Sequence, residues 1–459
     1  MLRSFLLSIS ILAIAGCDAG SSSGTGGSSD ATPRPLKGCA VDASVSSKIA
    51  PGGYYTNGAS VCTAGGSAHL FHGVARPSLE WDSAGEWRNA GGMRADFETM
   101  ASWHANVVRI GLNQDFWLSG AALHDPAYQA TVDRAVKTAE AAGLDVILDL
   151  HWSDRGDLTA SIVGQGQGKV GHADQQQMAD ANSQQFWLEV ATKYKDDGHV
   201  LFELYNEPHD IAWSTWLHGG NVLEYRAVGM QDLYDTVRRA GAHNLVIAGG
   251  TGWAFDLSQA AGDRIQGYNI IYATHPYAPQ DLEMQWDQMF GYLAAQDIAP
   301  VIATEFGDGS VMCNGDWDTK LTQYADARQI SWTAWAWYPA GCSFPALISD
   351  WNYTPTVQGA AIKAALLNYP YQPAGIPSAA GGSGGSGGSA GAAAGGSGGT
   401  AGVAGNTTAG TSGNTGSAGA SVNGGTAGVS GSAGAAGTSG ASGGSVGGGS
   451  GSGGSGGLN

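Results

Sequence analysis

The sequence predicts an α/β protein, a (β/α)8 (TIM) barrel that is followed by a disordered C-terminal tail. Three observations predict it. Short apolar segments typical of buried parallel strands alternate with amphipathic segments typical of helices through the middle of the chain. Polar and aromatic residues recur where these apolar segments end, which is where barrel enzymes carry their functional groups. The last part of the chain has a composition that cannot build a core.

Eight apolar segments have the composition of barrel strands. They are residues 68–76, 106–112, 144–151, 199–206, 244–248, 269–275, 299–305 and 330–337. Helical or helix-like segments follow them, and the clearest are residues 93–104, 126–142, 181–195, 225–240, 283–296, 318–328 and 356–367. The segment after the fifth strand has the weakest helical pattern. An irregular lead-in, residues 36–66, contains a small hairpin near 52–58 that we expect to close the bottom of the barrel.

Two of the predicted strands end in a glutamate. The strand 199–206 runs directly into Glu207, and Pro208 then ends the strand because proline cannot donate to the ladder. The strand 299–305 ends at Glu305 about a hundred residues later. Two carboxylates, each at the end of its own strand, are the equipment of a glycosidase.

Further polar and aromatic side chains are expected at the same mouth of the barrel, because alternate residues of a barrel strand point inward. Eight residues lie at or near the C-terminal ends of six strands: Arg109, His151, Asn206, Glu207, His275, Tyr277, Glu305 and Trp335. A buried structural network would explain one or two of them but not all eight. Glu203 has the parity of Glu207 and should point inward at a deeper level, where we expect a histidine or an arginine to pair with it.

Four motifs occur in order on the predicted strands. They are Asn206-Glu207-Pro208, His275-Pro276-Tyr277, Thr304-Glu305-Phe306-Gly307 and Trp332-Thr333-Ala334-Trp335-Ala336-Trp337. Together they resemble glycoside hydrolase family 5, the clan A family of many cellulases, and the resemblance runs from about residue 70 to 367. It implies that Glu207 is the general acid and then the base, that Glu305 is the nucleophile, and that the anomeric configuration is retained. A retaining mechanism requires carboxyl groups about 5–5.5 Å apart.

The resemblance also implies roles for the other residues at the mouth. Arg109 would lower the pKa of Glu305, while burial and repulsion from Glu305 would keep Glu207 protonated near neutral pH. The remaining residues would hold the sugar or the nucleophile: His275 and Tyr277 orient Glu305 and bind the sugar, Asn206 binds the 2-hydroxyl, His151 binds a further hydroxyl, and Trp335 forms the floor. Trp337 is the alternative floor if the register is shifted. Trp81, Trp152 and Trp253 are either sugar platforms or plain rim aromatics.

The N-terminus has the features of an export signal. One positive charge at Arg3 precedes a mostly apolar run over 5–15 that is too short to span a membrane. Ile14-Ala15-Gly16-Cys17 resembles the lipobox of bacterial lipoproteins, which implies that residues 1–17 are a signal peptide and that Cys17 carries the lipid. Residues 18–35 would then be a flexible tether, and the protein a membrane-anchored lipoprotein at the cell surface or in the periplasm. The alternative is an ordinary signal peptide and a secreted protein.

The tail, residues 373–459, has no charged and no aromatic residue and consists almost entirely of Gly, Ser, Ala and Thr. It cannot offset its backbone entropy, so we expect a disordered spacer. The folded catalytic domain is therefore predicted over 36–372, which contains all 15 Trp and 16 Tyr residues.

Cysteine count and charge narrow the remaining possibilities. Assigning Cys17 to lipid leaves four cysteines, which can form two disulfides in three ways. We expect Cys39–Cys62 and Cys313–Cys342, because this arrangement closes the shortest loops. No Cys-x-x-Cys motif occurs, and His72, His104 and His172 have no ligand spacing, so neither a metal nor a cofactor is expected. A net charge of −18 argues against nucleic acid as a partner and fits a neutral substrate. The protein is expected to be a monomer.

The predicted function is that of a retaining endo-β-glycosidase on a plant-type polysaccharide, with β-1,4-glucan as the expected substrate. A β-mannanase or another β-glycanase is the first alternative. The substrate is selected by loops such as 153–180 and 307–318, and their sequences do not indicate which polysaccharide they bind. A non-catalytic sugar-binding surface protein is the alternative from another class. The presence of both glutamates and Arg109 argues against it.

Overall fold

The structure is a computed structural model that describes residues 38–159, 175–310 and 314–374, apart from residues 224 and 343. By its contacts the chain divides into Met1–Gly384 and Gly385–Asn459, and every described residue belongs to the first unit. The predicted signal peptide, Cys17, the tether and the tail beyond residue 374 lie outside the described residues. Within the described part of the chain, no helix has both the length and the apolar character needed to cross a membrane.

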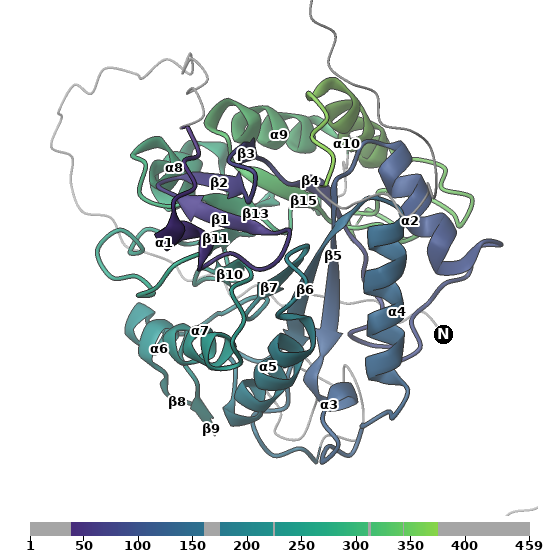
Figure 1. The fold of residues 1–459 in the computed structure, drawn as a ribbon. Helices are drawn as coiled ribbons and strands as arrows, with labels where there is room; N and C mark the ends of the chain where they lie inside the picture. The colour runs from purple at the N-terminus through teal and green to yellow at the C-terminus, as the bar shows by residue number, and fades with distance from the viewer. Residues whose placement is uncertain (1–37, 160–174, 224, 311–313, 343, 375–459) are drawn as a thin grey trace, which may run out of the picture. The chain divides into compact units, whose positions relative to one another are not determined.

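Eight parallel strands form a closed barrel, which confirms the predicted fold (Figure 1). In order around the barrel they are β4 (His72–Ala75), β5 (Val107–Asn113), β6 (Asp145–Trp152), β7 (Val200–Glu203), β10 (Val246–Gly249), β11 (Ile270–Thr274), β13 (Val301–Ala303) and β15 (Ser331–Ala334). Every residue of these strands is buried except Trp152 at the end of β6. Near-continuous burial is the reason that the strands are apolar on both faces.

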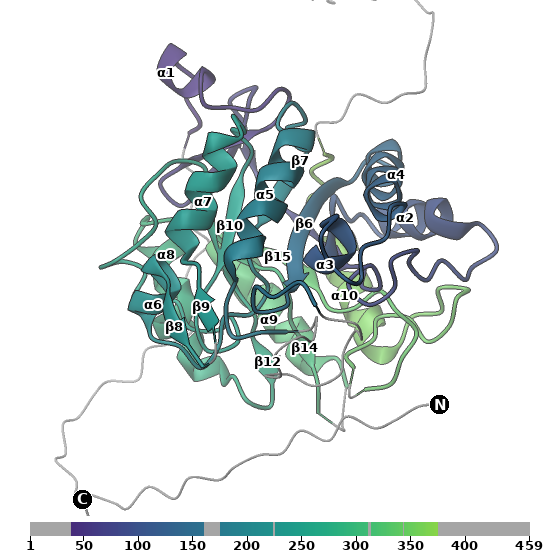
Figure 2. The same cartoon turned by 90° about the horizontal axis from the view of Figure 1, so that it is seen from below.

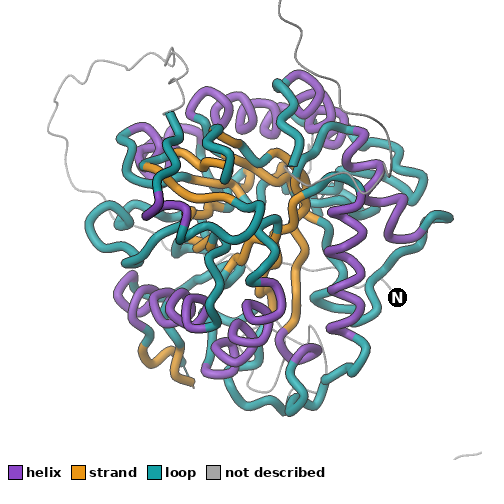
Figure 3. Tube along the Cα trace, viewed as in Figure 1, coloured by secondary structure: helices purple, strands orange, loops and turns teal. Residues whose placement is uncertain are grey.

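Helices surround the barrel (Figure 3). The longer ones are α2 (Gly92–Ser102), α4 (Tyr128–Ala141), α5 (Ala181–Tyr194), α7 (Met230–Arg239), α9 (Asp316–Arg328) and α10 (Val357–Asn368). In α4 the buried residues include Val132, Ala135, Val136 and Ala139, whose spacing of three and four places them on one face. The helix α5 begins at Asp180, whose carboxylate accepts hydrogen bonds from the backbone N–H groups of Asn182 and Ser183.

Short elements complete the described chain. They are α1 (Ala43–Ser46), β1 (Tyr54–Asn57), β2 (Ser60–Thr63), β3 (Ala68–His69), α3 (Gln114–Trp117), α6 (Trp213–His218), β8 (Gly220–Val222), β9 (Tyr225–Ala227), β12 (Tyr277–Ala278), η1 (Glu283–Gln285), η2 (Asp287–Gly291), α8 (Tyr292–Ala295) and β14 (Gly307–Asp308).

Two predicted elements are divided in the structure. The predicted strand 68–76 is two strands, because Ala68–His69 pairs with β2 and the chain then passes into β4. The predicted helix 225–240 begins only at Met230, because Tyr225–Ala227 pairs with β8. Gly229 stands between the two parts in an extended conformation, so close to the backbone of residues 217–219 that a Cβ atom would not fit.

Two predicted helical segments are also irregular. The segment after β10 contains turns and two isolated bridges, Gly250↔Ala254 and Thr251↔Asp256, in place of a helix. Positive φ angles at Gly252, Trp253 and Ala254 explain this, because consecutive left-handed residues cannot start a right-handed helix. The predicted helix 283–296 is broken into η1, the π-helical η2 and α8.

The N-terminal end of the barrel is closed by the predicted hairpin. Tyr54 and Val61 of β1 and β2 pack against interior strand residues such as Ile147 and Leu201. The disulfide Cys39–Cys62 joins the lead-in to the hairpin and confirms that prediction. Figure 2 shows the lead-in with α1 at one end of the barrel and the β12–β14 pair at the other.

Only one cysteine of the second predicted disulfide, Cys313–Cys342, lies among the described residues. Cys342 is disulfide-bonded. Cys313, its predicted partner, lies outside the described residues.

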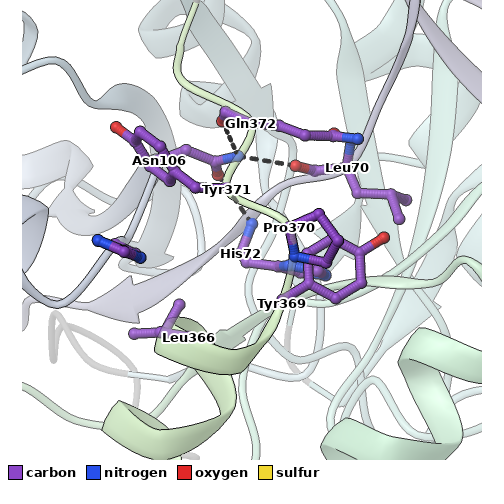
Figure 4. Close-up of a pocket in the computed structure, with 9 residues that line it drawn as sticks. Leu70, His72, Asn106, Leu366, Tyr369, Pro370, Tyr371 and Gln372 are labelled. Atoms are coloured by element: carbon purple, nitrogen blue, oxygen red, sulfur yellow. Dashed lines mark hydrogen bonds between the residues drawn. The ribbon is translucent and has the colours of Figure 1, made fainter.

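The end of the folded chain packs beside the start of β4 (Figure 4). Gln372 Oε1 accepts a hydrogen bond from Leu70 N at 2.7 Å, and Asn106 Nδ2 donates to the backbone oxygens of Gln372 and Leu70. Tyr369 packs edge-on against His72. Residues up to Gln372 therefore belong to the folded domain.

Candidate active site

The eight residues predicted for the mouth of the barrel lie together there. Arg109 is on β5 and His151 on β6, whereas the other six lie just beyond the ends of strands β7, β11, β13 and β15. Hydrogen bonds, ion pairs and one ring stack link all eight residues, in part through Asp149.

The short strands β12 and β14 extend the barrel beyond its rim and set the position of Tyr277. Tyr277 pairs with Gly307, two residues after Glu305. This parallel pairing places the Tyr277 hydroxyl beside Glu305, to whose Oε2 it donates a hydrogen bond at 2.7 Å. The contact thus follows from the way in which two adjacent strands leave the barrel.

Arg109 is the buried centre of the site. Its Nη1 lies 2.5 Å from Glu305 Oε1, and its Nε lies 2.5 Å from Glu203 Oε2. Its Nη2 donates to Asn206 Oδ1 at 2.6 Å and lies 2.9 Å from Asp149 Oδ2. One guanidinium therefore satisfies three buried carboxylates, which would otherwise be too costly to bury as charges. The prediction that Glu203 is buried and paired with a cation is confirmed.

Glu305 is an ionised carboxylate. Its exposed fraction is 4%. Burial opposes ionisation, but the positive charges of Arg109, His275 and His151 outweigh it and lower the pKa of Glu305 below its ordinary value. A carboxylate held in this form near neutral pH can attack an electrophilic carbon.

His275 is a buried cation beside the second glutamate. Its Nδ1 lies 3.1 Å from Glu207 Oε1, and its Nε2 lies 2.8 Å from Thr304 Oγ1. Burial alone would lower the pKa of His275, but the carboxylates of Glu305, Glu203 and Glu207 raise it to about 9. The sequence predicted that His275 would orient Glu305. Its hydrogen bond goes instead to Glu207, because Glu305 Oε2 is 3.9 Å away and is already bound by Tyr277.

The two glutamates face each other across a short gap. One carboxylate oxygen of each and a ring nitrogen of His275 lie within 4.8 Å of one another. The two carboxyl groups therefore lie close enough for both to flank one glycosidic bond. These three groups are close enough to hold a metal ion, but Arg109 and the His275 imidazolium already supply positive charge to both carboxylates.

His151 and Trp335 form the adjoining wall. His151 Nδ1 lies 2.7 Å from Asp149 Oδ2, and the carboxylates of Asp149, Glu80 and Glu305 raise its pKa to about 9 against the opposing effect of burial. The Trp335 ring lies parallel to the imidazole, with 5.9 Å between ring centroids and an interplanar angle of 14°. Trp335 is 8% exposed, whereas Trp337 is wholly buried against Trp103, so Trp335 is the tryptophan at the mouth.

Four groups at the site were not predicted. Asp149 and Thr304 support Arg109, His151 and His275, and Glu80 is a buried carboxylate near His151. The parity of β6, which places Asp149 on the same side as His151, could have revealed the first. The fourth is Gln175, whose Nε2 donates to Glu207 Oε2. It comes from a loop whose sequence gives no indication of its position.

Aromatic side chains stand around the mouth. Trp81 lies between Trp152 and Tyr338, with ring centroids 6.4 Å and 5.6 Å away. Trp253 is 39% exposed and stacks on His209 with 3.7 Å between centroids. His209 is two residues from Glu207, and its Nδ1 lies 2.8 Å from the Glu207 backbone oxygen.

A closed eight-stranded barrel that carries two facing carboxylates at its C-terminal mouth, one of them paired with an arginine, has the fold and the pair of acids of a glycoside hydrolase. Residues 57–341 match the family model described as "Cellulase (glycosyl hydrolase family 5)". The chain belongs to glycoside hydrolase family 5.

Relatives with assigned names agree with this family. The chain is 24% identical over 292 residues to Endoglucanase MaCel5A of Microbulbifer sp. (strain ALW1), which covers 61% of this chain and 49% of that protein. It is 25% identical over 264 residues to an endoglucanase of Paenibacillus polymyxa, which covers 48% of this chain and 60% of that one. The chain thus spans about half the length of the curated relatives it matches.

Solved structures have the same fold. The β-glucanase SdGluc5_26A from Saccharophagus degradans superposes with a TM-score of 0.54 at 22% identity, over 73% of this chain and 97% of that one. A hyperthermophilic endocellulase from Pyrococcus horikoshii gives a TM-score of 0.55 at 16% identity, over 69% and 99% of the two chains.

Proposed function

We propose that the protein is an endo-β-1,4-glucanase that retains the anomeric configuration. The observation that carries the proposal is the pair Glu207 and Glu305. One oxygen of each lies within 4.8 Å of the other, and Arg109 and Tyr277 hold Glu305 as a carboxylate. This is the arrangement that double displacement at a sugar carbon requires.

In the first step Glu305 attacks the anomeric carbon while Glu207 delivers its proton to the leaving glycosidic oxygen. The bond between the carbon and that oxygen breaks, and a glycosyl ester forms on Glu305. In the second step Glu207, now a carboxylate, takes a proton from a water molecule that attacks the same carbon. Glu305 leaves as a carboxylate, and both residues return to their starting forms.

The remaining residues at the mouth would hold the sugar. Asn206 accepts from Arg109 through its Oδ1, and its Nδ2 is buried without a partner in the described structure. That amide N–H is free to donate to a 2-hydroxyl, a contact that strengthens in the transition state. His151 offers a second donor, and the ring of Trp335, which is 8% exposed, provides an apolar surface for a sugar face.

The choice of β-1,4-glucan is supported by relatives named endoglucanase or endocellulase, and by a β-glucanase and an endocellulase whose structures include complexes with cellotetraose. The test is hydrolysis of soluble derivatives of cellulose, mannan and xylan by the full-length protein, Glu207→Gln and Glu305→Gln. Loss of viscosity in the cellulose derivative, absent in both variants, is expected. Faster cleavage of mannan or xylan than of cellulose would overturn the substrate, and undiminished activity in Glu305→Gln would overturn the nucleophile.

We further propose that the protein is an exported, monomeric lipoprotein, with residues 1–17 as its signal peptide, a lipid on Cys17, residues 18–35 as its tether and residues 373–459 as a spacer. The basis is the apolar run before Cys17 and the Ser- and Gly-rich segment after it. Labelled palmitate should be incorporated into the native protein and not into Cys17→Ser, which should leave the membrane fraction. Equal labelling of both would contradict the anchor, and a dimeric mass in light scattering would contradict the monomer.

A further inference from the structure

Both oxygens of the Glu207 carboxyl group have a nitrogen donor. His275 Nδ1 lies 3.1 Å from Oε1, and the side-chain amide of Gln175 donates to Oε2. The Glu207 side chain remains 13% exposed, so its outer edge is still open to a glycosidic oxygen. The proposed acid and base is therefore held by two partners of different kinds, a cation and a neutral amide.

Gln175 is held in place by the same segment that carries Glu207. The hydroxyl of Tyr205 donates to Gln176 O at 2.8 Å, and His209 N donates to Gln177 O at 3.1 Å. Tyr205 and His209 stand on either side of Glu207, two residues away in each direction. These contacts tie the two residues that follow Gln175 to the stretch that carries Glu207, and so bring Gln175 beside Glu207.

The three residues that follow Gln175 make further contacts that hold the segment, and none of their side chains bonds Glu207 in the described structure. The Gln176 side chain is buried, and its Oε1 accepts from Arg155 Nε at 2.5 Å. Met178 N lies 3.0 Å from the Tyr225 hydroxyl, which in turn lies 2.6 Å from Met178 O. The Gln177 side chain points to Asp210 O at 3.5 Å. Of the three consecutive glutamines, it is Gln175 whose side chain contacts Glu207.

An amide suits a group that changes its protonation state during turnover. A primary amide has two N–H donors and a carbonyl acceptor. It can donate to the Glu207 carboxylate that exists after the leaving group has been protonated. After a half-turn of its terminal torsion, its carbonyl oxygen can accept from the Glu207 carboxylic acid that the first step requires, until that proton passes to the leaving oxygen. No proton passes through the amide, and Glu207 exchanges its proton only with the leaving oxygen and with water.

We propose that Gln175 is a positioning residue that keeps the Glu207 carboxyl group oriented in both protonation states. The inference rests on the proposed function, because it needs Glu207 to act as acid and base. It predicts that Gln175 matters most where the leaving group needs a proton and least where the leaving group departs unaided.

The test compares Gln175→Met with the matched control Gln177→Met on two aryl β-cellobiosides. One carries 2,4-dinitrophenol, which leaves as a stable anion, and the other carries phenol, which needs protonation. In Gln175→Met we expect kcat/KM for the phenyl substrate to fall by about tenfold, a part of the full effect of general acid catalysis. The value for the dinitrophenyl substrate should stay within about twofold of the native enzyme. Gln177→Met should behave as the native enzyme on both.

A second variant gives a readout that a purely structural role would not change. Gln175→Glu places a carboxyl group of the same shape next to Glu207. The added negative charge favours the protonated form of its neighbour, so the basic limb of the pH profile of kcat/KM should move to higher pH. Gln177→Glu, on the same segment, should leave that limb in place.

The outcomes separate this inference from the function on which it rests. An equal loss on both aryl substrates in Gln175→Met, no loss on either, or the same loss in Gln177→Met would overturn the role of Gln175 while the enzyme remains a glucanase. If the native protein cleaves neither β-1,4-glucan nor either cellobioside, the proposed function fails and the inference fails with it.

Discussion

The two ends of the barrel both bury charged groups but use them differently, and strand β6 makes the comparison direct. Near its start, Asp145 Oδ2 accepts from the Tyr54 hydroxyl at 2.7 Å, and its Oδ1 lies 2.7 Å from His199 Nδ1. Four residues later, Asp149 shares Arg109 with Glu203 and Glu305. The first network joins the β1–β2 hairpin to the barrel.

The second network has one guanidinium among three carboxylates, and one of these, Glu305, faces Glu207 at the mouth. Buried charge alone therefore does not identify an active site. What distinguishes the mouth is a cation shared by several carboxylates, one of which faces a second glutamate.

The largest effect is expected at Glu305. Replacing its carboxylate in Glu305→Gln removes the nucleophile and should lower kcat on soluble cellulose by about 10⁴-fold or more. Asp145→Asn at the opposite end should leave kcat unchanged in the folded protein, because it contacts none of the groups at the mouth. Initial rates at saturating substrate measure both. A similar fall in the two variants would remove the distinction between the ends.

The next largest effect is expected on stability. Arg109→Met leaves Glu203, Glu305 and Asp149 buried without their cation, which should lower the free energy of unfolding by about 3–5 kcal/mol. Asp145→Asn keeps an acceptor for Tyr54 and should lower it by about 1–3 kcal/mol. Urea denaturation measures both values. If Arg109→Met does not fold, Arg109→Lys is the second variant, because it keeps the positive charge but not the three donor nitrogens of the guanidinium. A native-like stability in Arg109→Lys would contradict the central role of the guanidinium.

A smaller effect is expected at Tyr277. Tyr277→Phe removes the hydrogen bond to Glu305 Oε2, which helps to lower the pKa of Glu305. The pKa of Glu305 should rise, so the acidic limb of the kcat/KM profile should move to higher pH and the rate at the optimum should fall by about tenfold. Tyr54→Phe is the matched control at the other end of the barrel, and it should weaken stability without moving this limb. An unmoved acidic limb in Tyr277→Phe would contradict the assigned contact.

The pH dependence of stability should reflect the two histidines at the mouth. Their folded pKa values of about 9 lie above the ordinary value of 6.5, so the stabilisation that they contribute is complete below pH 6.5 and is lost as the pH rises towards 9. Thermal unfolding between pH 6 and pH 9.5 should show this loss. It should be reduced in His151→Gln, and a stability that rises over this interval would contradict the imidazolium forms.

A similar loss is expected at low pH. The folded pKa of Glu203 is about 2, because burial, which would raise it, is outweighed by Arg109 and His275. The ordinary value is 4.5, so the stabilisation from Glu203 is present above pH 4.5 and is lost as the pH falls towards 2. Urea denaturation across this interval should show the loss. The loss should be smaller in Glu203→Gln, where the lowered pKa of Glu305 still contributes, and an equal loss in both proteins would contradict the role of Glu203.

Much of the barrel could be predicted because its strands are apolar and end in polar groups. The parity of successive residues places His151, Glu207 and Glu305 at one mouth, since a parallel barrel has one orientation for all its strands. The same reasoning could not detect the division of 68–76, because only the apolar residues Leu70 and Phe71 separate β3 from β4, which differ in their pairing partners. It also could not detect that β8 and β9 pair ahead of α7, a contact between residues separated by a turn.

The sequence predicted which residues lie at the site better than it predicted which of them form hydrogen bonds with each other. The hydrogen-bond partner of His275 depends on which carboxylate oxygen lies nearest to its Nδ1. That oxygen is Oε1 of Glu207, whereas Oε2 of Glu305 accepts from Tyr277. Gln175 belongs to a loop without strand or helix periodicity. Tyr205 and His209 hold the next two residues of that loop by their backbone oxygens, which side-chain patterns in the sequence do not report. Sequence patterns report which face a residue occupies, but they do not report which of two neighbours it bonds.

The central claim is that Glu305 is the nucleophile of a retaining enzyme, and trapping its covalent intermediate tests this most directly. The fluorine of a 2-deoxy-2-fluoro-β-cellobioside slows both steps, whereas a dinitrophenyl leaving group speeds only the first, so the ester accumulates. Mass spectrometry of the digested protein should locate one fluorocellobiosyl group on Glu305, and Glu305→Gln should carry none. A label on Glu207, or release of the α-anomer from a β-glucan, would contradict the account.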